Sequence, residues 1–194
     1  YTSTGTFTVS LTASNAFGND TETKTGYITV SEGGSWVVIT YDDFEGGWGS
    51  YTDGGGDCAL YTGGTYAHQG SNAADIQDNS GAASSFYHSA GHDVSGYTEL
   101  EVDFWYLPIS MDNRREDFWL QYYDGSSWQT VATWVRAIDF DNGVFYHEVV
   151  TISNSQYDFP TNARLRFLCD ASGNQDDVYI DEIEWRGISG TAGM

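Results

Sequence analysis

The chain has 194 residues, enough to bury the core of one β-sandwich of ordinary size together with a further fragment. Its 28 acidic and 7 basic residues give a formal net charge of -21, and Lys24 is the only lysine, so the phosphates of nucleic acids and of anionic lipids would be repelled. No run of about 20 apolar residues is present. We therefore expect neither nucleic acid nor direct membrane insertion.

Residues 5–30 are predicted to form a β-hairpin. Apolar side chains alternate with Thr and Ser over 5–13, Asn, Gly and Asp supply a turn within 15–20, and a return strand covers 21–30. A lone hairpin is at best marginally stable in water, so its apolar face needs a cover. The side chains of that face, our candidate assembly strands, are Phe7, Val9, Leu11, Ile28 and Val30.

The same stretch resembles the closing strands of a PKD domain, an immunoglobulin-like module of many secreted proteins. The resemblance rests on Gly-Thr-Phe-Thr-Val-Ser-Leu-Thr-Ala-Ser-Asn-Ala-Phe-Gly at 5–18 and Tyr-Ile-Thr-Val at 27–30. We interpret 1–31 as an incomplete PKD-like hairpin, covered by upstream residues, by the rest of this chain or by a neighbouring molecule. The last alternative predicts a self-associating subunit of a fibre or surface assembly. Asn19 begins a glycosylation sequon on the turn.

A second unit is predicted over 41–187, after a linker and the start of the first strand at 32–40 and before a flexible tail at 188–194. Short alternating strands separated by Gly, Asn and Asp turns, without helical periodicity, predict an all-β jelly-roll sandwich. The clearest predicted strands cover 100–109, 116–123, 129–138, 146–153, 163–170 and 177–186.

This second unit resembles the jelly-roll modules found beside PKD domains in secreted bacterial enzymes and surface proteins, which are related in shape to carbohydrate-binding modules and MAM domains. The resemblance implies an extracellular, secreted or cell-surface setting and names no ligand. The residues that support it are Asp-Asp-Phe-Glu-Gly-Gly-Trp at 42–48, Asp-Cys at 57–58, the 78–85 loop, Glu-Asp-Phe-Trp-Leu-Gln-Tyr at 116–122, and 169–174 leading into 178–183.

Four carboxylates form a candidate calcium site. Asp43 and Glu45 share one strand face, and a sandwich that closes end to end would bring Asp181 and Glu182 beside them as hard oxygen ligands. Carbohydrate-binding jelly rolls tie their first and last strands through calcium with a Phe-Glu-Gly start and a late Asp, and the resemblance therefore assigns these roles to Glu45 and Asp181. The alternative is that the four are solvated edge carboxylates.

Cys58 and Cys169 are the only cysteines, and in an acidic, lysine-poor β-protein they favour one disulfide formed in an oxidising compartment. Such a bond would attach a Gly-rich loop to the last strands. Two free buried thiols are the alternative.

An aromatic strip is predicted on the polar side of two strands, because Phe and Leu residues occupy the core side. Its members are Trp105, Trp119, Gln121 and Tyr123. Aromatic faces beside amides can bind a sugar or a protein partner, or they can form a second core face.

No catalytic motif is present: His88 and His92 lie four apart without a helix, and no nucleophile elbow, zinc motif or phosphate loop occurs. We expect a non-enzymatic extracellular module. The sequence slightly favours assembly through the hairpin, with polysaccharide binding through the aromatic strip as the alternative.

Overall fold

The computed structural model describes residues 3–30, 34–77 and 81–189. The chain divides into two units, one of residues 1–35 with 190–194 and one of residues 36–189. No helix among the described residues has the length and apolar character needed to cross a membrane.

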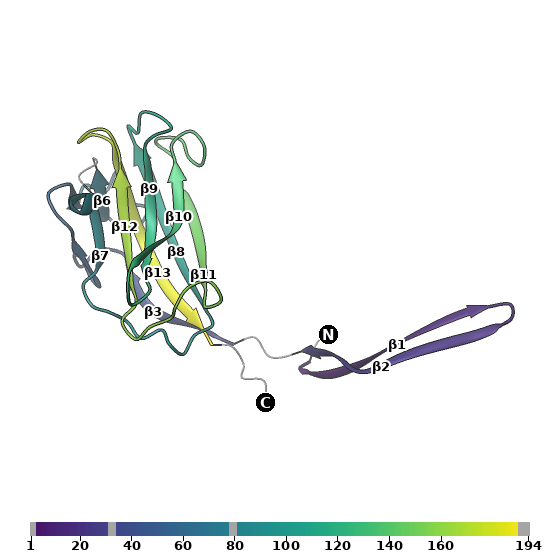
Figure 1. The fold of residues 1–194 in the computed structure, drawn as a ribbon. Helices are drawn as coiled ribbons and strands as arrows, with labels where there is room; N and C mark the ends of the chain where they lie inside the picture. The colour runs from purple at the N-terminus through teal and green to yellow at the C-terminus, as the bar shows by residue number, and fades with distance from the viewer. Residues whose placement is uncertain (1–2, 31–33, 78–80, 190–194) are drawn as a thin grey trace. The chain divides into compact units, whose positions relative to one another are not determined.

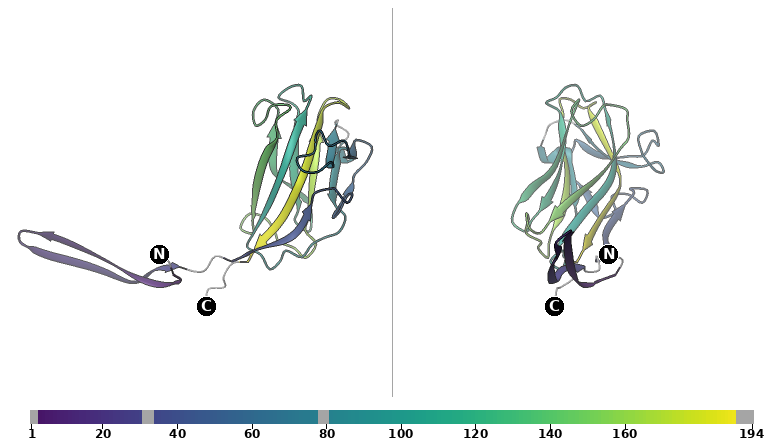
Figure 2. Two further views of the ribbon diagram at one scale, coloured as in Figure 1. Left: turned by 180° about the vertical axis from the view of Figure 1, so that it is seen from behind. Right: turned by 90° about the vertical axis from the view of Figure 1, so that its right-hand side faces the viewer.

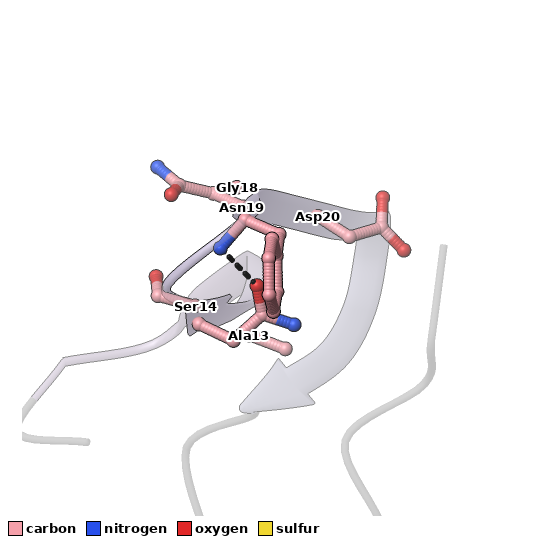
Figure 3. A pocket seen from close by; sticks show the side chains of 7 residues that line it. Ala13, Ser14, Gly18, Asn19 and Asp20 are labelled. Carbon is pink, nitrogen blue, oxygen red and sulfur yellow. Dashed lines mark hydrogen bonds between the residues drawn. The ribbon is translucent and has the colours of Figure 1, made fainter.

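The first unit is a two-stranded antiparallel sheet of β1 (Gly5–Asn15) and β2 (Gly18–Val30). Phe7 pairs with Ile28, and a bulge follows before Val9. The opposite face is a ladder of hydroxyl groups in which the Thr12 and Thr21 oxygens lie 2.9 Å apart. At the tip, Asn15 Oδ1 accepts a hydrogen bond of 2.8 Å from the Phe17 N–H, beside a shallow hollow of about 370 Å³ (Figure 3).

The apolar side chains of the hairpin differ in exposure: Phe7, Val9, Ile28 and Val30 are half-buried, and three others are exposed. Leu11 is 72% exposed, Tyr27 63% and Phe17 99%. The hairpin thus presents apolar surface to solvent, which is the feature that motivated the assembly hypothesis.

The second unit is a sandwich of antiparallel strands with one short 3₁₀ helix, η1. In chain order its elements are β3 (Trp36–Asp42), β4 (Tyr51–Asp53), β5 (Cys58–Tyr61), β6 (Ala73–Gln77), η1 (Gly81–Ser84), β7 (Ser85–His88), β8 (Glu99–Ile109), β9 (Asp117–Tyr123), β10 (Trp128–Val135), β11 (Tyr146–Ser153), β12 (Arg164–Asp170) and β13 (Asp177–Ile188).

Two sheets make up the sandwich, as Figures 1 and 2 show. One has the strand order β10-β9-β12-β7-β4, and the other has the order β11-β8-β13-β6-β5 with β3 also paired to β13. Strands distant in sequence are neighbours in each sheet, which confirms the predicted all-β jelly-roll sandwich.

Strand β13 organises the six-stranded sheet. It pairs with β8 along its length, with β6 over residues 177–180 and with β3 over residues 183–188. A bulge between Asp181 and Glu184 separates the two partners on that side, and Glu182 has a φ of 50°. The irregular backbone lets Ile180 and Ile183 both enter the core, while Asp181 stays on the outer side of the strand with Tyr179.

The core between the sheets is held by aromatic contacts. Phe104 on β8 packs against Phe167 on β12, with ring centroids 5.0 Å apart, and against Trp134 on β10 at 5.4 Å. Phe118 on β9 stacks on Trp134 at 4.8 Å. Because these edge-to-face and offset contacts fix the inward side chains, they also fix which residues of β9, β10 and β12 point outward.

Replacing Leu120 by alanine should lower the free energy of unfolding of the sandwich by about 2–5 kcal/mol, because Leu120 is fully buried and the substitution leaves a cavity. Urea unfolding followed by tryptophan fluorescence measures this. Leu11→Ala in the hairpin, where the side chain is 72% exposed, is the control and should change the same free energy by less than about 0.5 kcal/mol. Equal effects of the two substitutions would contradict the assignment of the core.

Candidate functional site

The outer surface of the five-stranded sheet carries a group of large aromatic and polar side chains. They alternate with core residues such as Phe118, Leu120, Leu165 and Phe167, so they point away from the second sheet. We call this group the aromatic-arginine face, and its members are Trp119, Gln121 and Tyr123 of β9, Trp128 of β10, and Arg164 and Arg166 of β12.

Arg166 is held by contacts to two other residues of this face. Its guanidinium lies over the Trp128 ring, 4.4 Å from the centroid. Its Nε donates a 2.8 Å hydrogen bond to Gln121 Oε1, and Gln121 Nε2 donates to Thr130 Oγ1 at 3.1 Å. Partial burial lowers the pKa of Arg166, although an arginine stays charged at any ordinary pH. These contacts fix the orientation of the guanidinium plane before any ligand arrives.

A hollow of about 190 Å³ lies at the same end of the face, lined by Tyr123, Trp128, Asn162 and Arg164. The rings of Tyr123 and Trp128 are 5.4 Å apart and inclined by 54°. The hollow is smaller than the roughly 300–1,000 Å³ of pockets for drug-sized ligands, so it suits one ring of a longer ligand.

The opposite end of the face is acidic. Asp117 and Asp170 are paired across β9 and β12. Burial and, secondarily, the charge of Asp170 raise the pKa of Asp117 to about 6. The face therefore has a cationic end at Arg164 and Arg166 and an anionic end at the two aspartates.

Trp105 does not belong to this face. It lies on β8, in the six-stranded sheet, whereas Trp119, Gln121 and Tyr123 lie on β9 in the other sheet. The Trp105 ring is stacked between the rings of His68, at 3.7 Å, and His147, at 4.7 Å. The sequence predicted one strip because both strands alternate in the same way, and alternation does not specify the sheet to which a strand belongs.

Three residues of the face were missed by the sequence analysis: Trp128, Arg164 and Arg166. A signal for Trp128 was available, because the Asp124-Gly125 turn makes β9 and β10 neighbours and sets Trp128 opposite Tyr123. The two arginines required knowledge that β12 pairs with β9, which is a long-range contact.

Three of the four acids of the predicted calcium site fasten a loop of the sandwich. Asp181 Oδ2 accepts hydrogen bonds of 2.9 Å from the backbone N–H groups of His68 and Gln69, and Glu45 Oε1 accepts two of 2.7 Å from Ser71 and Asn72. Glu182 pairs with the His68 ring.

The remaining acid, Asp43, accepts a 3.1 Å hydrogen bond from the Glu45 N–H through Oδ1. The carboxylates of Glu45, Asp181 and Glu182 thus have protein donors on the 68–72 loop, and the four acids do not gather their oxygens around one centre. Calcium binding by Asp43, Glu45, Asp181 and Glu182 stays a prediction.

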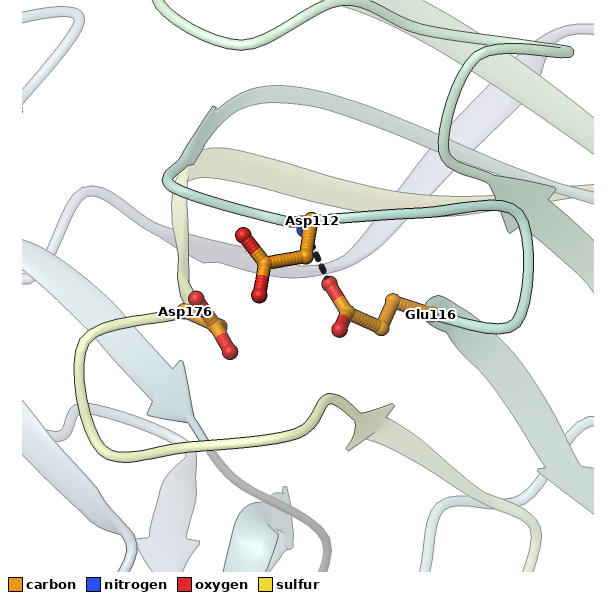
Figure 4. A group of neighbouring side chains, drawn as sticks. All are labelled: Asp112, Glu116 and Asp176. Atoms are coloured by element: carbon orange, nitrogen blue, oxygen red, sulfur yellow. Dashed lines mark hydrogen bonds between the residues drawn. The ribbon is translucent and has the colours of Figure 1, made fainter.

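The carboxylates of a different group of acidic residues do lie close together. Asp112 and Glu116 of the β8–β9 loop and Asp176, which precedes β13, have ligand oxygens within 4.8 Å of one another (Figure 4). Glu116 is 2% exposed and Asp176 7%. Glu116 accepts hydrogen bonds from the Asp112 N–H and Asn113 Nδ2, and Asp176 Oδ2 accepts one from Ser172 Oγ at 3.1 Å. The two buried carboxylates, Glu116 and Asp176, thus accept hydrogen bonds from residues of their own loops.

The predicted disulfide is not formed. Cys58, at the start of β5, and Cys169, on β12, belong to different sheets, and both are free and buried in the core. Each thiol fills a position between apolar side chains, as unpaired cysteines commonly do. Burial raises the pKa of both thiols, so neither is a nucleophile at neutral pH.

Comparison with known proteins supports the fold. No family model matches the sequence, and no curated protein matches it either. Solved structures do match. The CBM22-1–GH10 modules of Clostridium thermocellum endo-1,4-β-D-xylanase 10B, complexed with xylohexaose, are 17% identical with a TM-score of 0.57, over 81% of this chain and 30% of that chain.

The CBM22-1 xylan-binding domain of a Paenibacillus barcinonensis protein is 14% identical with a TM-score of 0.56, over 84% of this chain and 100% of that chain. The binding domain of botulinum neurotoxin serotype G is 11% identical with a TM-score of 0.52, over 80% of this chain and 49% of that chain. At such identities the likeness shows a shared jelly-roll fold, and a fold alone does not determine a ligand. The PKD resemblance of the hairpin gains no support from these matches.

We expect neither cysteine of the native protein to react with a thiol reagent at neutral pH, because both thiols are buried and protonated. In denaturant without reductant both should react. Ellman titration of native and unfolded protein measures the two counts. Absence of reactive thiols in the unfolded protein would reveal a disulfide and contradict the structure.

Asp75 and Asp117 should each make the sandwich less stable as the pH rises from about 4 to about 7. Burial, and secondarily the charge of Asp177, raise the pKa of Asp75 to about 7 from the usual 3.8, and Asp117 is shifted upward in the same way. At these two groups the folded protein binds more protons than the unfolded chain in this pH range, so their deprotonation favours unfolding, whereas the lowered pKa values of His88 and His92 act in the opposite direction. Urea unfolding of wild type and of Asp75→Asn at several pH values isolates the contribution of Asp75, and the stability of wild type relative to the variant should fall over this range. A constant difference between the two proteins would contradict the shift.

Proposed function

We propose that this chain is a non-catalytic, extracellular carbohydrate-binding module that holds a polysaccharide on the aromatic-arginine face. The observation that supports the proposal most directly is the placement of Trp119, Tyr123 and Trp128 on one open sheet surface beside Gln121 and Arg166. Aromatic rings cover the apolar C–H faces of sugar rings, and amide and guanidinium groups bond to the hydroxyls around them.

The solved structures of similar fold suggest the class of ligand. One solved structure of similar fold is named a xylan-binding domain, and another contains xylohexaose. For this chain we therefore propose a plant-type polysaccharide chain as the ligand. Since such polymers lie outside cells, the proposal also implies an extracellular location.

The core histidine His88 illustrates why we propose binding without catalysis. It is fully buried, its Nδ1 accepts a 3.0 Å hydrogen bond from the Leu165 N–H, and burial lowers its pKa well below the usual value. Its ring is stacked on Tyr51 and Trp185, with centroids 4.3 and 5.1 Å away. A neutral, enclosed imidazole of this kind packs the core and cannot reach a substrate.

Assembly through β1 and β2 is a second candidate function, favoured by the exposure of Leu11, Phe17 and Tyr27. It would use a different part of the chain from polysaccharide binding, so the two candidates are separable by experiment. Sedimentation of the full chain and of a chain lacking residues 1–33 tests the assembly candidate: self-association that disappears with the hairpin supports it, and a monomer in both cases excludes it.

Replacing Trp119 or Trp128 by alanine should weaken binding to soluble xylan by about tenfold or more, as truncation of a central aromatic anchor does. Affinity electrophoresis and isothermal titration calorimetry measure the loss.

Trp105→Ala is the matched control. It removes the same side chain from the other sheet, and it should leave the affinity unchanged in folded protein. Deleting residues 1–33 should also spare polysaccharide binding. The proposal fails if wild-type protein binds no polysaccharide of a broad panel, or if Trp105→Ala weakens binding as much as the other two substitutions.

A further inference from the structure

The two arginines of the aromatic-arginine face have no acidic partner. Arg136 is paired with Asp141 at 2.7 Å, and Arg186 is paired with Glu101 at 2.7 Å and with Glu184 at 3.0 Å. Among the described residues, neither Arg164 nor Arg166 has a carboxylate within ion-pair distance. Lys24, Arg114 and Arg115 also lack a carboxylate partner among the described residues, but Arg164 and Arg166 are the two that lie side by side on the outer surface of a sheet.

The acids near this end of the face are turned away or distant from it. Asp124, in the adjoining turn, uses its oxygens to accept bonds from Ser126, Ser127 and Gln129 within 2.8–2.9 Å. Asp117 and Asp170 lie at the far end of β9 and β12, while Arg164 is paired with Tyr123 at the near end. Arg166 donates from Nε and Nη2 to Gln121 Oε1, so the edge of its guanidinium that carries Nη1 is the one left for an external anion, together with the guanidinium of Arg164.

Arg166 is prepared for a planar anion in particular. Stacking on Trp128 and the bond to Gln121 hold the guanidinium plane, so little conformational entropy is lost when a ligand binds. A carboxylate is the anionic group that matches a guanidinium fork through two parallel hydrogen bonds. Beside it, the hollow formed by Tyr123, Trp128, Asn162 and Arg164 offers space for the ring that bears the carboxylate.

The net charge restricts how many carboxylates the ligand can have. A polymer with a carboxylate on every ring would be repelled by a protein of formal charge -21 and by the Asp117 and Asp170 end of the face. A mostly neutral chain with occasional uronic acid units avoids this repulsion while it still supplies one carboxylate to the arginines.

We infer that the aromatic-arginine face selects neutral polysaccharides that carry sparse uronic acid substituents, an inference that rests on the proposed function. The carboxylate of the uronic acid is bound by Arg166 and Arg164. Trp119 and Tyr123 contact the neutral sugar rings. This assigns the substrate class within the proposed site and gives the two arginines a role in specificity.

The test compares glucuronate-substituted xylan with the same polymer after its carboxyl groups have been reduced to alcohols. Wild-type protein should bind the carboxylate form about tenfold more tightly, because a charge-assisted bidentate contact is lost on reduction. Isothermal titration calorimetry at two salt concentrations measures the difference, which should shrink as salt screens the contact.

Four variants refine the test. Arg164→Gln and Arg166→Gln should lose the preference for the carboxylate form while they still bind the reduced polymer, and Arg166→Lys should retain only part of it because lysine lacks the planar fork. Arg114→Gln, which removes the same charge from the exposed β8–β9 loop, should behave as wild type.

The outcomes are distinguishable. If wild-type protein binds both polymers equally, the uronate inference is overturned and the proposed function stands. If it binds neither polymer, both fail. If it binds fully de-esterified polygalacturonate more tightly than the sparsely substituted xylan, the restriction to sparse carboxylates is overturned. Thermal unfolding of each variant shows that the protein compared is folded.

Discussion

The sandwich depends on one strand, β13, and on the irregularity within it. β13 contacts three strands of its sheet, and the bulge after Asp181 lets it pair with β6 before that point and with β3 beyond it. A regular strand would keep one partner on each side. Just before the bulge, the Asp181 carboxylate accepts hydrogen bonds from the backbone of His68 and Gln69 and so fastens a loop to the outer surface of this sheet. The loop covers this surface around Trp105 and Tyr179, and the outer surface of the other sheet carries the aromatic-arginine face.

The open face is rigid because the core behind it is aromatic. Phe104, Phe118, Trp134 and Phe167 interlock between the sheets. Trp119, Gln121 and Arg166 each lie between two buried core residues of their own strand. A ligand that binds there meets side chains that are already in position, so little of the binding free energy is lost in ordering them. Nothing in this arrangement requires a deep pocket, which agrees with an extended polymer lying along a sheet.

The sequence pattern predicted correctly those features that depend on residues close together in the chain. Period-two alternation placed Trp119, Gln121 and Tyr123 correctly on the outward side of one strand, and it identified the hairpin of β1 and β2. It could not divide strands between two sheets, so Trp105 was grouped with residues of the other sheet, and it could not bring Arg166 beside Gln121. The cysteines show the same limit, since a bond depends on which core positions face each other and composition does not contain that information.

The single lysine has a practical consequence. Lys24 lies on β2, with its ammonium group 5.0 Å from the centre of the Tyr27 ring, and no other side chain of the protein offers a primary amine. Amine-directed coupling to a sensor chip, a bead or a fluorescent dye therefore attaches through the hairpin and leaves every side chain of the sandwich unmodified. An immobilised or labelled sample is therefore modified at one defined side chain, and the side chains on the sheet surfaces of the sandwich stay unmodified.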